Sequence, residues 1–240
     1  MISDPRNGGI AIIDFGSQYT QLIARRVREQ GVYAEVFPHD ITLERLSSKS
    51  PCAYILSGGP DSIYDIDAPK LYPAILNSGM PILGICYGMY LVANSFGGKV
   101  QASETREYGP GEIILKGTNP LFAGLPDDLD VWMSHGDHVT SLPPGFDLLA
   151  QSNNGIFAAI GDKTRKIYGV QFHPEVNHTP HGIDLIRNFI FDICGCEAKW
   201  SPAVFVNDAL ARIKNQVGDK RVLLGLSGGV DSAVAAALIH

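Results

Sequence analysis

Short apolar runs alternate with amphipathic stretches through the first hundred residues. Four runs predict buried strands, at 10–15, 34–37, 53–56 and 81–85. Apolar positions at helical spacing predict helices after Thr20 up to Gly31, around 43–46, over 69–77, and from the end of the fourth strand to 97–98. This alternation predicts a parallel, doubly wound sheet, which binds ligands at the carboxyl ends of its strands.

Residues 99–171 have a different pattern. Short strand-like runs at 113–115, 131–133, 148–150, 156–160 and 167–171 are separated by turns rich in Gly, Pro, Asn and Asp. We expect these runs to add antiparallel strands to the same sheet. The stretch SHGDH at 134–138 is expected to be a loop at a strand end, and 182–194 has the spacing of an amphipathic helix.

The end of the chain predicts a second domain. The stretch 195–202 (GCEAKWSP) is a plausible linker, followed by an amphipathic helix at 203–217, a buried strand at 222–226 and a helix at 233–239. One strand with its helices cannot bury a core. The fold class is therefore α/β: a mostly parallel, doubly wound sheet with antiparallel additions over 1–197, and the incomplete start of a second α/β nucleotide-binding domain over 198–240.

Composition narrows the class of protein. The 240 residues are 45% hydrophobic and 18% charged, as in ordinary globular chains, and the net charge of −6 argues against nucleic acid as a partner. No run of 18 apolar residues predicts a membrane span. The start of the chain lacks a secretory signal pattern, and the four cysteines do not resemble a disulfide framework, so we expect a reducing cytoplasm. No metal site is predicted.

The stretch GICYG at 84–88 has the form of a nucleophile elbow, with Cys86 where hydrolases carry serine. Side chains at Gly84 and Gly88 would crowd such a turn, and the N-terminus of the following helix favours a thiolate. The alternative is a buried structural cysteine beside packing glycines. This stretch alone leaves the two interpretations about equal.

The stretch HPE at 173–175 could supply a base. Pro174 biases His173 toward an extended conformation, in which residues two apart share a face, so Glu175 would lie beside the imidazole. A cysteine nucleophile needs a base that a third group orients. By itself the motif is more typical of a surface turn.

The stretch SGGVDS at 227–232 follows a predicted strand and opens a helix. Its amides and hydroxyls suit a phosphate or pyrophosphate, although it is not a Walker A loop. The alternative is an ordinary turn between a strand and a helix.

With these residues in hand, the chain resembles the N-terminal part of the glutamine-hydrolysing GMP synthases: a class I glutamine amidotransferase domain followed by the start of an ATP-pyrophosphatase domain. The resemblance spans nearly the whole chain. It is carried by IIDFGSQYTQLIARRVRE, LSGGP, GICYGM, VWMSHGD, YGVQFHPEV, FIFDICGCEAKW and LLGLSGGVDS.

The resemblance implies a role for each matching residue. Cys86 would be the nucleophile, His173 the general base and acid, and Glu175 the residue that orients His173. Backbone N–H groups of Gly59 and Tyr87 would form the oxyanion hole. The resemblance also implies two groups of ligand-binding residues, one for glutamine and one for ATP. Glutamine would lie against Tyr90, Ser134, His135 and Gly136, and ATP against Ser227, Gly228, Gly229, Val230, Asp231, Ser232 and Ala233. The family usually has Gln at the position of Tyr90.

The implied activity is glutamine hydrolysis to glutamate and ammonia, with the ammonia aminating ATP-activated XMP to GMP. Glutamine, ATP and XMP would be substrates, Mg²⁺ would accompany ATP, and the glutaminase domain would need no cofactor. We expect a homodimer, formed through a C-terminal region outside these 240 residues. Two alternatives stay open: a glutaminase partner for another synthetase, and a non-catalytic binding domain whose pocket Tyr90 blocks.

Overall fold

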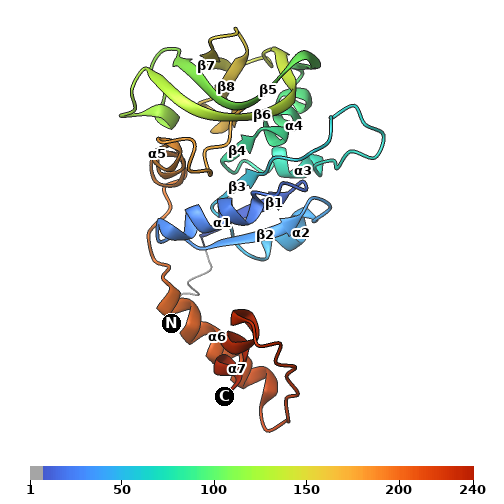
Figure 1. Cartoon of the computed structure of the whole chain (residues 1–240), viewed down its shortest axis with the longest axis vertical. Helices are drawn as coiled ribbons and strands as arrows, with labels where there is room; N and C mark the ends of the chain where they lie inside the picture. The colour runs from blue at the N-terminus through green and yellow to red at the C-terminus, as the bar shows by residue number, and fades with distance from the viewer. Residues whose placement is uncertain (1–7) are drawn as a thin grey trace. The chain divides into compact units, whose positions relative to one another are not determined.

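The computed structural model describes residues 8–240, apart from the side chains of 103–107 and 208. Residues 1–7 of the predicted first domain lie outside the described residues. The chain divides into two compact units, one ending at Ala198 and one running from Lys199 to His240 (Figure 1). Each unit is described by itself below.

The first unit is built on one nine-stranded sheet in the order β2-β1-β3-β4-β9-β8-β7-β5-β6. Its strands are β1 (Ile10–Asp14), β2 (Ala34–Pro38), β3 (Ala53–Leu56), β4 (Ile82–Ile85), β5 (Lys99–Leu115), β6 (Asp128–Ser141), β7 (Asp147–Ser152), β8 (Phe157–Asp162) and β9 (Ile167–Val170). Strands β2, β1, β3, β4 and β9 are parallel, and the others join them antiparallel. The predicted fold class of this unit is confirmed.

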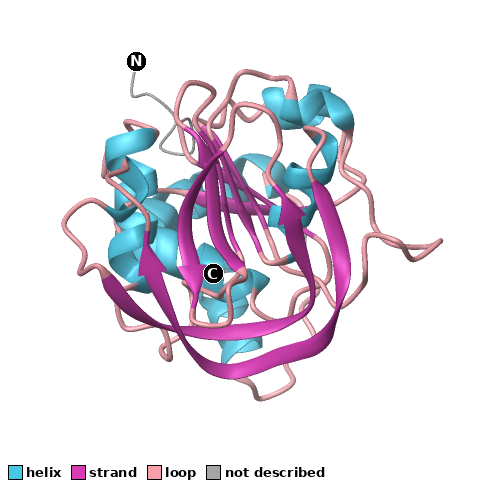
Figure 2. Cartoon of the chain, turned by 90° about the horizontal axis from the view of Figure 1, so that it is seen from above, coloured by secondary structure: helices cyan, strands magenta, loops and turns pink. Residues whose placement is uncertain are grey.

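Helices flank the strands on both sides (Figure 2). They are α1 (Thr20–Glu29), α2 (Leu43–Ser47), α3 (Pro73–Leu76), α4 (Tyr87–Ser95), the 3₁₀ turn η1 (Pro120–Phe122), α5 (Gly182–Arg187) and the π-helix η2 (Asn188–Ile193). Alternate side chains of the parallel strands pack into two separate hydrophobic cores. Ile12 and Ile55 pack in the core that contains residues of α1 and α5, whereas Ile13 and Leu56 pack with α3 and α4.

Several boundary predictions were wrong. The first helix was expected to start after Thr20, but Thr20 is the first residue of α1, and its hydroxyl donates to the carboxylate of Asp14 at 2.7 Å. The predicted helix at 69–77 shortens to α3, which begins at Pro73, a residue suited to a first helical turn. The helix predicted over 182–194 continues as a π-helix from Asn188.

Two further predictions were wrong because of contacts between residues that are far apart in the sequence. The predicted loop 134–138 lies inside β6, because β5 pairs with it from Ser134 to His138. The prediction that the cysteines form no disulfide was also wrong, since Cys52 is bonded to Cys196. The two residues are 144 positions apart in the sequence, so their spacing gave no sign of the bond.

The second unit contains α6 (Pro202–Val217) and α7 (Val230–Ile239). The prediction of a strand at 222–226 was wrong: this segment has no regular secondary structure, and Leu223 is fully exposed. A strand needs a neighbouring strand to accept and donate its hydrogen bonds, and the described residues of this unit provide none. Nowhere in residues 8–240 does a helix combine the length and the apolar character needed to span a membrane.

Candidate active site

Cys86 lies in a sharp turn between β4 and α4. Its backbone has φ 50° and ψ −105°, a strained conformation for a residue with a side chain. A Cβ on Gly84 would come within 2.5 Å of the Gly88 backbone, and one on Gly88 would meet the carbonyl oxygen of Leu56. The two glycines therefore let α4 pack directly on β3 and β4 while the strained turn holds the thiol.

The structure brings the three predicted residues of the triad together. Nδ1 of His173 lies 2.7 Å from Oε1 of Glu175, and Cys86 lies close enough to the same imidazole for its sulfur to raise the pKa of His173. All three side chains are buried, Glu175 completely. The backbone N–H of His173 donates to the carbonyl of Trp132 in β6 at 3.0 Å, which anchors the segment after β9.

The charge of His173 follows from its neighbours. Burial by itself lowers the pKa of an imidazole. Here the carboxylate of Glu175 and the sulfur of Cys86 outweigh that burial and raise the pKa of His173 to about 10. The imidazole is therefore protonated at neutral pH.

Residues without a predicted role contact His173 and Glu175 and hold them in place. The Tyr19 ring lies edge-on to His173, with ring centroids 5.2 Å apart. The Thr179 hydroxyl donates to the carbonyl of His173 at 2.7 Å, and Nε of Arg26 donates to the carbonyl of Glu175 at 2.9 Å. No spacing signal marked these contacts, because they join segments far apart in the chain or act through backbone atoms.

The loop after β3 lies against the elbow. A Cβ on Gly59 would come within 2.6 Å of the Phe15 carbonyl oxygen and 3.4 Å of the Tyr87 ring. Among the described residues, the N–H groups of Gly59 and Tyr87 have no hydrogen-bond partner. Ser57 fixes the loop, because its hydroxyl accepts from the N–H of Phe15 at 2.9 Å and donates to the carbonyl of Gly58 at 2.8 Å.

The predicted glutamine-binding residues divide between two faces of β6. The Sγ of Cys86 donates to the carbonyl of Ser134 at 3.4 Å, so this part of β6 lies beside the thiol. Ser134 and Gly136 share a face of the strand, whereas the buried His135 points to the other face. The carbonyl of Ser134 is therefore the part of this segment that the structure places at Cys86.

Tyr90 lies one helical turn after Cys86 and is buried. Its hydroxyl donates to the carbonyl of Asp137 at 2.6 Å and accepts from Nε2 of Gln171 at 2.6 Å. The same Nε2 is 3.9 Å from the sulfur of Cys86. Gln171 had no predicted role, although its place two residues before His173 puts it on the same face of an extended segment.

In the second unit, the predicted ATP loop ends at the N-terminus of α7. The hydroxyls of Ser227 and Ser232 are 3.2 Å apart, Ser232 donates to the carbonyl of Gly229 at 2.9 Å, and the loop is exposed. Val230, Asp231 and Ala233 belong to α7 itself.

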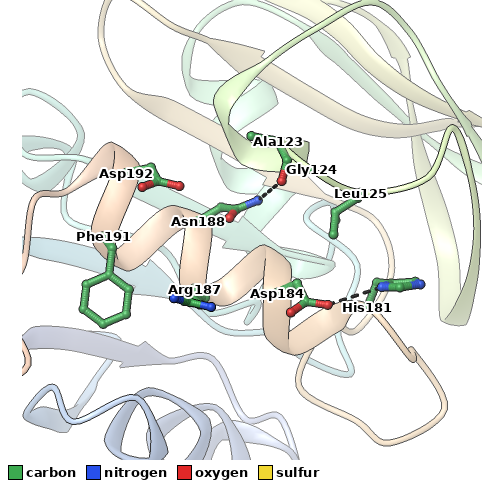
Figure 3. Close-up of a pocket in the computed structure, with 9 residues that line it drawn as sticks. All are labelled: Ala123, Gly124, Leu125, His181, Asp184, Arg187, Asn188, Phe191 and Asp192. Carbon is green, nitrogen blue, oxygen red and sulfur yellow. Dashed lines mark hydrogen bonds and ion pairs between the residues drawn. The ribbon is translucent and has the colours of Figure 1, made fainter.

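Two surface pockets are lined by none of the predicted site residues. One, of about 410 Å³, lies between η1 and the α5–η2 segment and is lined by Asp184, Arg187 and Asn188, among others (Figure 3). The other, of about 320 Å³, is lined by Tyr19 and Arg26 on α1 and by Val176 to His178. No residue of the triad lines either pocket.

Known proteins resemble this chain closely. The glutamine-hydrolysing GMP synthases of Syntrophomonas wolfei and Thermomicrobium roseum are each 52% identical to it, over 96% and 99% of the chain. The chain covers 45% of each relative, so it spans about half the length of the curated proteins it matches.

Solved structures of related proteins also resemble this chain. A Thermoplasma acidophilum protein, provisionally named as one subunit of a GMP synthase, has a TM-score of 0.72 and 36% identity, covering 78% of this chain and 94% of that one. A glutamine amidotransferase from Thermotoga maritima, at 18% identity, has a TM-score of 0.63 over 78% of this chain and 99% of its own, and shows the fold alone. The family model for class-I glutamine amidotransferases matches residues 11–193, from β1 through η2, and the chain therefore belongs to that family.

Proposed function

We propose that this chain is the glutaminase part of a glutamine-hydrolysing GMP synthase. The observation that carries the proposal is the buried His173–Glu175 hydrogen bond near the strained turn that holds Cys86, at the edge of a class-I amidotransferase sheet. Its extension to GMP synthesis rests on the relatives named above, of which the chain spans about half.

The chemistry begins at the sulfur. The thiolate of Cys86 attacks the side-chain carbonyl carbon of glutamine, and imidazolium His173 gives its proton to the departing nitrogen, releasing ammonia and leaving a thioester. His173 then takes a proton from water as the water attacks the thioester. The carbon–sulfur bond breaks, glutamate leaves, and Glu175 keeps the imidazole oriented throughout.

Backbone groups would bind the developing charge. The N–H groups of Gly59 and Tyr87 would donate to the oxyanion, a contribution of about 3 kcal/mol per donor in comparable sites. The β6 backbone at Ser134 to Gly136 would hold the glutamine backbone. The Tyr90 hydroxyl already has partners on both sides, which argues against a direct hydrogen bond from it to the substrate.

The ammonia would react with XMP after ATP has activated it. The loop from Ser227 to Gly229, which leads into α7, has the hydroxyl and amide groups that suit a pyrophosphate. Mg²⁺ would accompany ATP as a co-substrate. Among the described residues, no group of three or more His, Cys, Asp or Glu side chains could hold a metal ion, and no step is assigned to the ion. Homodimer formation belongs to the same proposal and rests on the resemblance. A cytoplasmic setting is also part of the proposal, and in that reducing compartment the Cys52–Cys196 disulfide would be exposed to reduction.

The test is Cys86→Ala in the full-length synthase. We expect loss of glutamine-dependent GMP formation, by a factor on the order of 10³ or more, with ammonia-dependent formation unchanged. Measuring the glutamine-dependent and the ammonia-dependent reactions, both with XMP and ATP, distinguishes the activity of the glutaminase part from that of the synthetase part. Loss of the ammonia-dependent reaction would contradict the division of labour. Glutamine-dependent amination of another acceptor in place of XMP would point to a different synthetase.

A further inference from the structure

A chain of hydrogen bonds ends at the sulfur of Cys86. It runs from the carbonyl of Asp137 through the hydroxyl of Tyr90 to the side-chain amide of Gln171, whose Nε2 is 3.9 Å from Sγ. Tyr90 is 3% exposed and Gln171 is fully buried. Polar groups at such depth are costly unless they are paired, so the arrangement of this chain is tightly determined.

The partners fix which way the Gln171 amide points. A carbonyl can only accept, so the single hydroxyl hydrogen of Tyr90 goes to Asp137. The hydroxyl oxygen must then accept from Gln171, which places NH₂ rather than the carbonyl toward Tyr90 and the sulfur. Burial, with the Cys86 sulfur nearby, raises the pKa of Tyr90 well above its usual value, so the hydroxyl keeps its proton.

Only Tyr90 holds this orientation. The amide carries two hydrogens, one of which Tyr90 accepts, leaving the other for the sulfur. The carbonyl oxygen Oε1 of Gln171 is buried and has no hydrogen-bond partner among the described residues. Without the Tyr90 hydroxyl, no other described group would keep the NH₂ of Gln171 turned toward Cys86.

We propose that Gln171 is a further catalytic residue, whose amide N–H donates to the sulfur of Cys86 when the sulfur is anionic, and that Tyr90 is the positioning residue that aims it. The inference rests on the proposed role of Cys86 as nucleophile. The sulfur is anionic before it attacks the substrate and again when water breaks the thioester, and an N–H donor stabilises it at both points.

The test removes the donor and leaves the shape. Gln171→Met is unbranched and of similar length but has no N–H. In the full-length protein we expect iodoacetamide to alkylate Cys86 about tenfold more slowly at neutral pH, the size expected for one hydrogen bond to a charged group. Mass spectrometry of the Cys86 peptide gives the rate. Ultraviolet absorbance, read against Cys86→Ala, should show a smaller thiolate fraction at the same pH.

Tyr90→Phe tests the positioning role, because it keeps the ring and removes the hydroxyl. It should slow alkylation by a smaller factor in the natural chain and have no further effect in the Gln171→Met background. Tyr168→Phe is the matched control: it removes another buried hydroxyl from β9, on the face opposite Gln171, and should alkylate at the natural rate.

Two results would overturn the inference: natural alkylation rate and thiolate absorbance in a folded Gln171→Met variant, or a Tyr90→Phe effect that persists undiminished in that background. If Gln171→Met does not fold, Gln171→Leu, which has neither a donor nor a charge, takes its place with the same expectation. Failure of the proposed function would appear differently, as glutamine turnover that survives in Cys86→Ala.

Discussion

At the scale of single residues, the charge on the buried imidazole of His173 is set by its two neighbours in the site, Glu175 and Cys86. A carboxylate on one neighbour and a sulfur on another keep it protonated far above the pH at which a free histidine loses its proton. The group is thus prepared to donate a proton to the leaving nitrogen, the step for which a neutral imidazole would have nothing to give.

This charge predicts a pH dependence of stability. The pKa of His173 is raised from 6.5 to about 10 in the folded protein, so its stabilising contribution is fully present below about pH 6.5 and is lost as the pH rises through about 10. Denaturant unfolding at a series of pH values should show this decline in the natural chain. The decline should be weaker in Glu175→Gln. Parallel stability curves for the two proteins would contradict the assignment.

The second prediction at this scale concerns the contribution of the Ser57 hydroxyl to stability. Ser57→Ala would leave the buried N–H of Phe15 without an acceptor, which we expect to cost about 1–3 kcal/mol of folding free energy. The midpoint of thermal unfolding should fall by several degrees. Ser48→Ala, at an exposed hydroxyl that bonds only to its own helix, is the control and should change the midpoint little. Equal midpoints for the two variants would show that Ser57 is not needed to hold the loop.

At the scale of elements, the elbow depends on how closely α4 approaches β3. The N–H of Gly88 donates to the carbonyl of Ser57 at 3.1 Å, which links the helix to the loop carrying Gly59. This contact places the two unpartnered N–H groups of Gly59 and Tyr87 near each other. The geometry of the proposed oxyanion hole is therefore a property of the packing between a helix and a strand.

Gly88→Ala tests that packing. The added Cβ would meet the backbone carbonyl and side chain of Leu56, which cannot move without shifting β3. We expect a loss of about 1–3 kcal/mol from overpacking, despite the better helix propensity of alanine, and a fall in glutaminase activity. Gly225→Ala, where a Cβ meets open space, is the control. An unchanged unfolding midpoint for Gly88→Ala would mean that the close approach is not required.

At the scale of the whole molecule, the disulfide ties the end of the first unit to its sheet. Cys196 lies two residues before the boundary at Ala198, and Cys52 comes just before β3. A bond that closes a loop of this length restricts the unfolded chain strongly, with an upper estimate of about 5 kcal/mol.

We expect the oxidised protein to lose thermal stability in Cys196→Ser and after treatment with a reductant, by similar amounts. Peptide mapping under non-reducing conditions should recover the Cys52 and Cys196 peptides joined. Cys194, which is free and two residues away, should be alkylated without a reductant once the protein is denatured, and serves as the internal control. Alkylation of Cys52 and Cys196 without a reductant would contradict the bond.

Local patterns predicted much of the molecule from sequence. The strand β3 has the predicted bounds, β1, β2, β4 and β9 were placed within one residue at each end, and GICYG predicted the elbow itself. The HPE motif placed a carboxylate beside an imidazole because residues two apart share a face of an extended chain. These features depend on neighbours within a few positions, so a linear pattern contains them.

Only the tertiary structure decided the remaining features, because each needs a partner distant in the chain. The stretch 134–138 became strand because β5 pairs with it, whereas 222–226 stayed unpaired because its unit offers no strand. Gln171 gained a partner in Tyr90, 81 positions earlier, and Cys52 found Cys196. By itself the sequence determined the order of elements and the identity of the reactive groups. The packing of the sheet and helices determined which of those groups meet, since side-chain contacts across the fold depend on register and distance that no local spacing encodes.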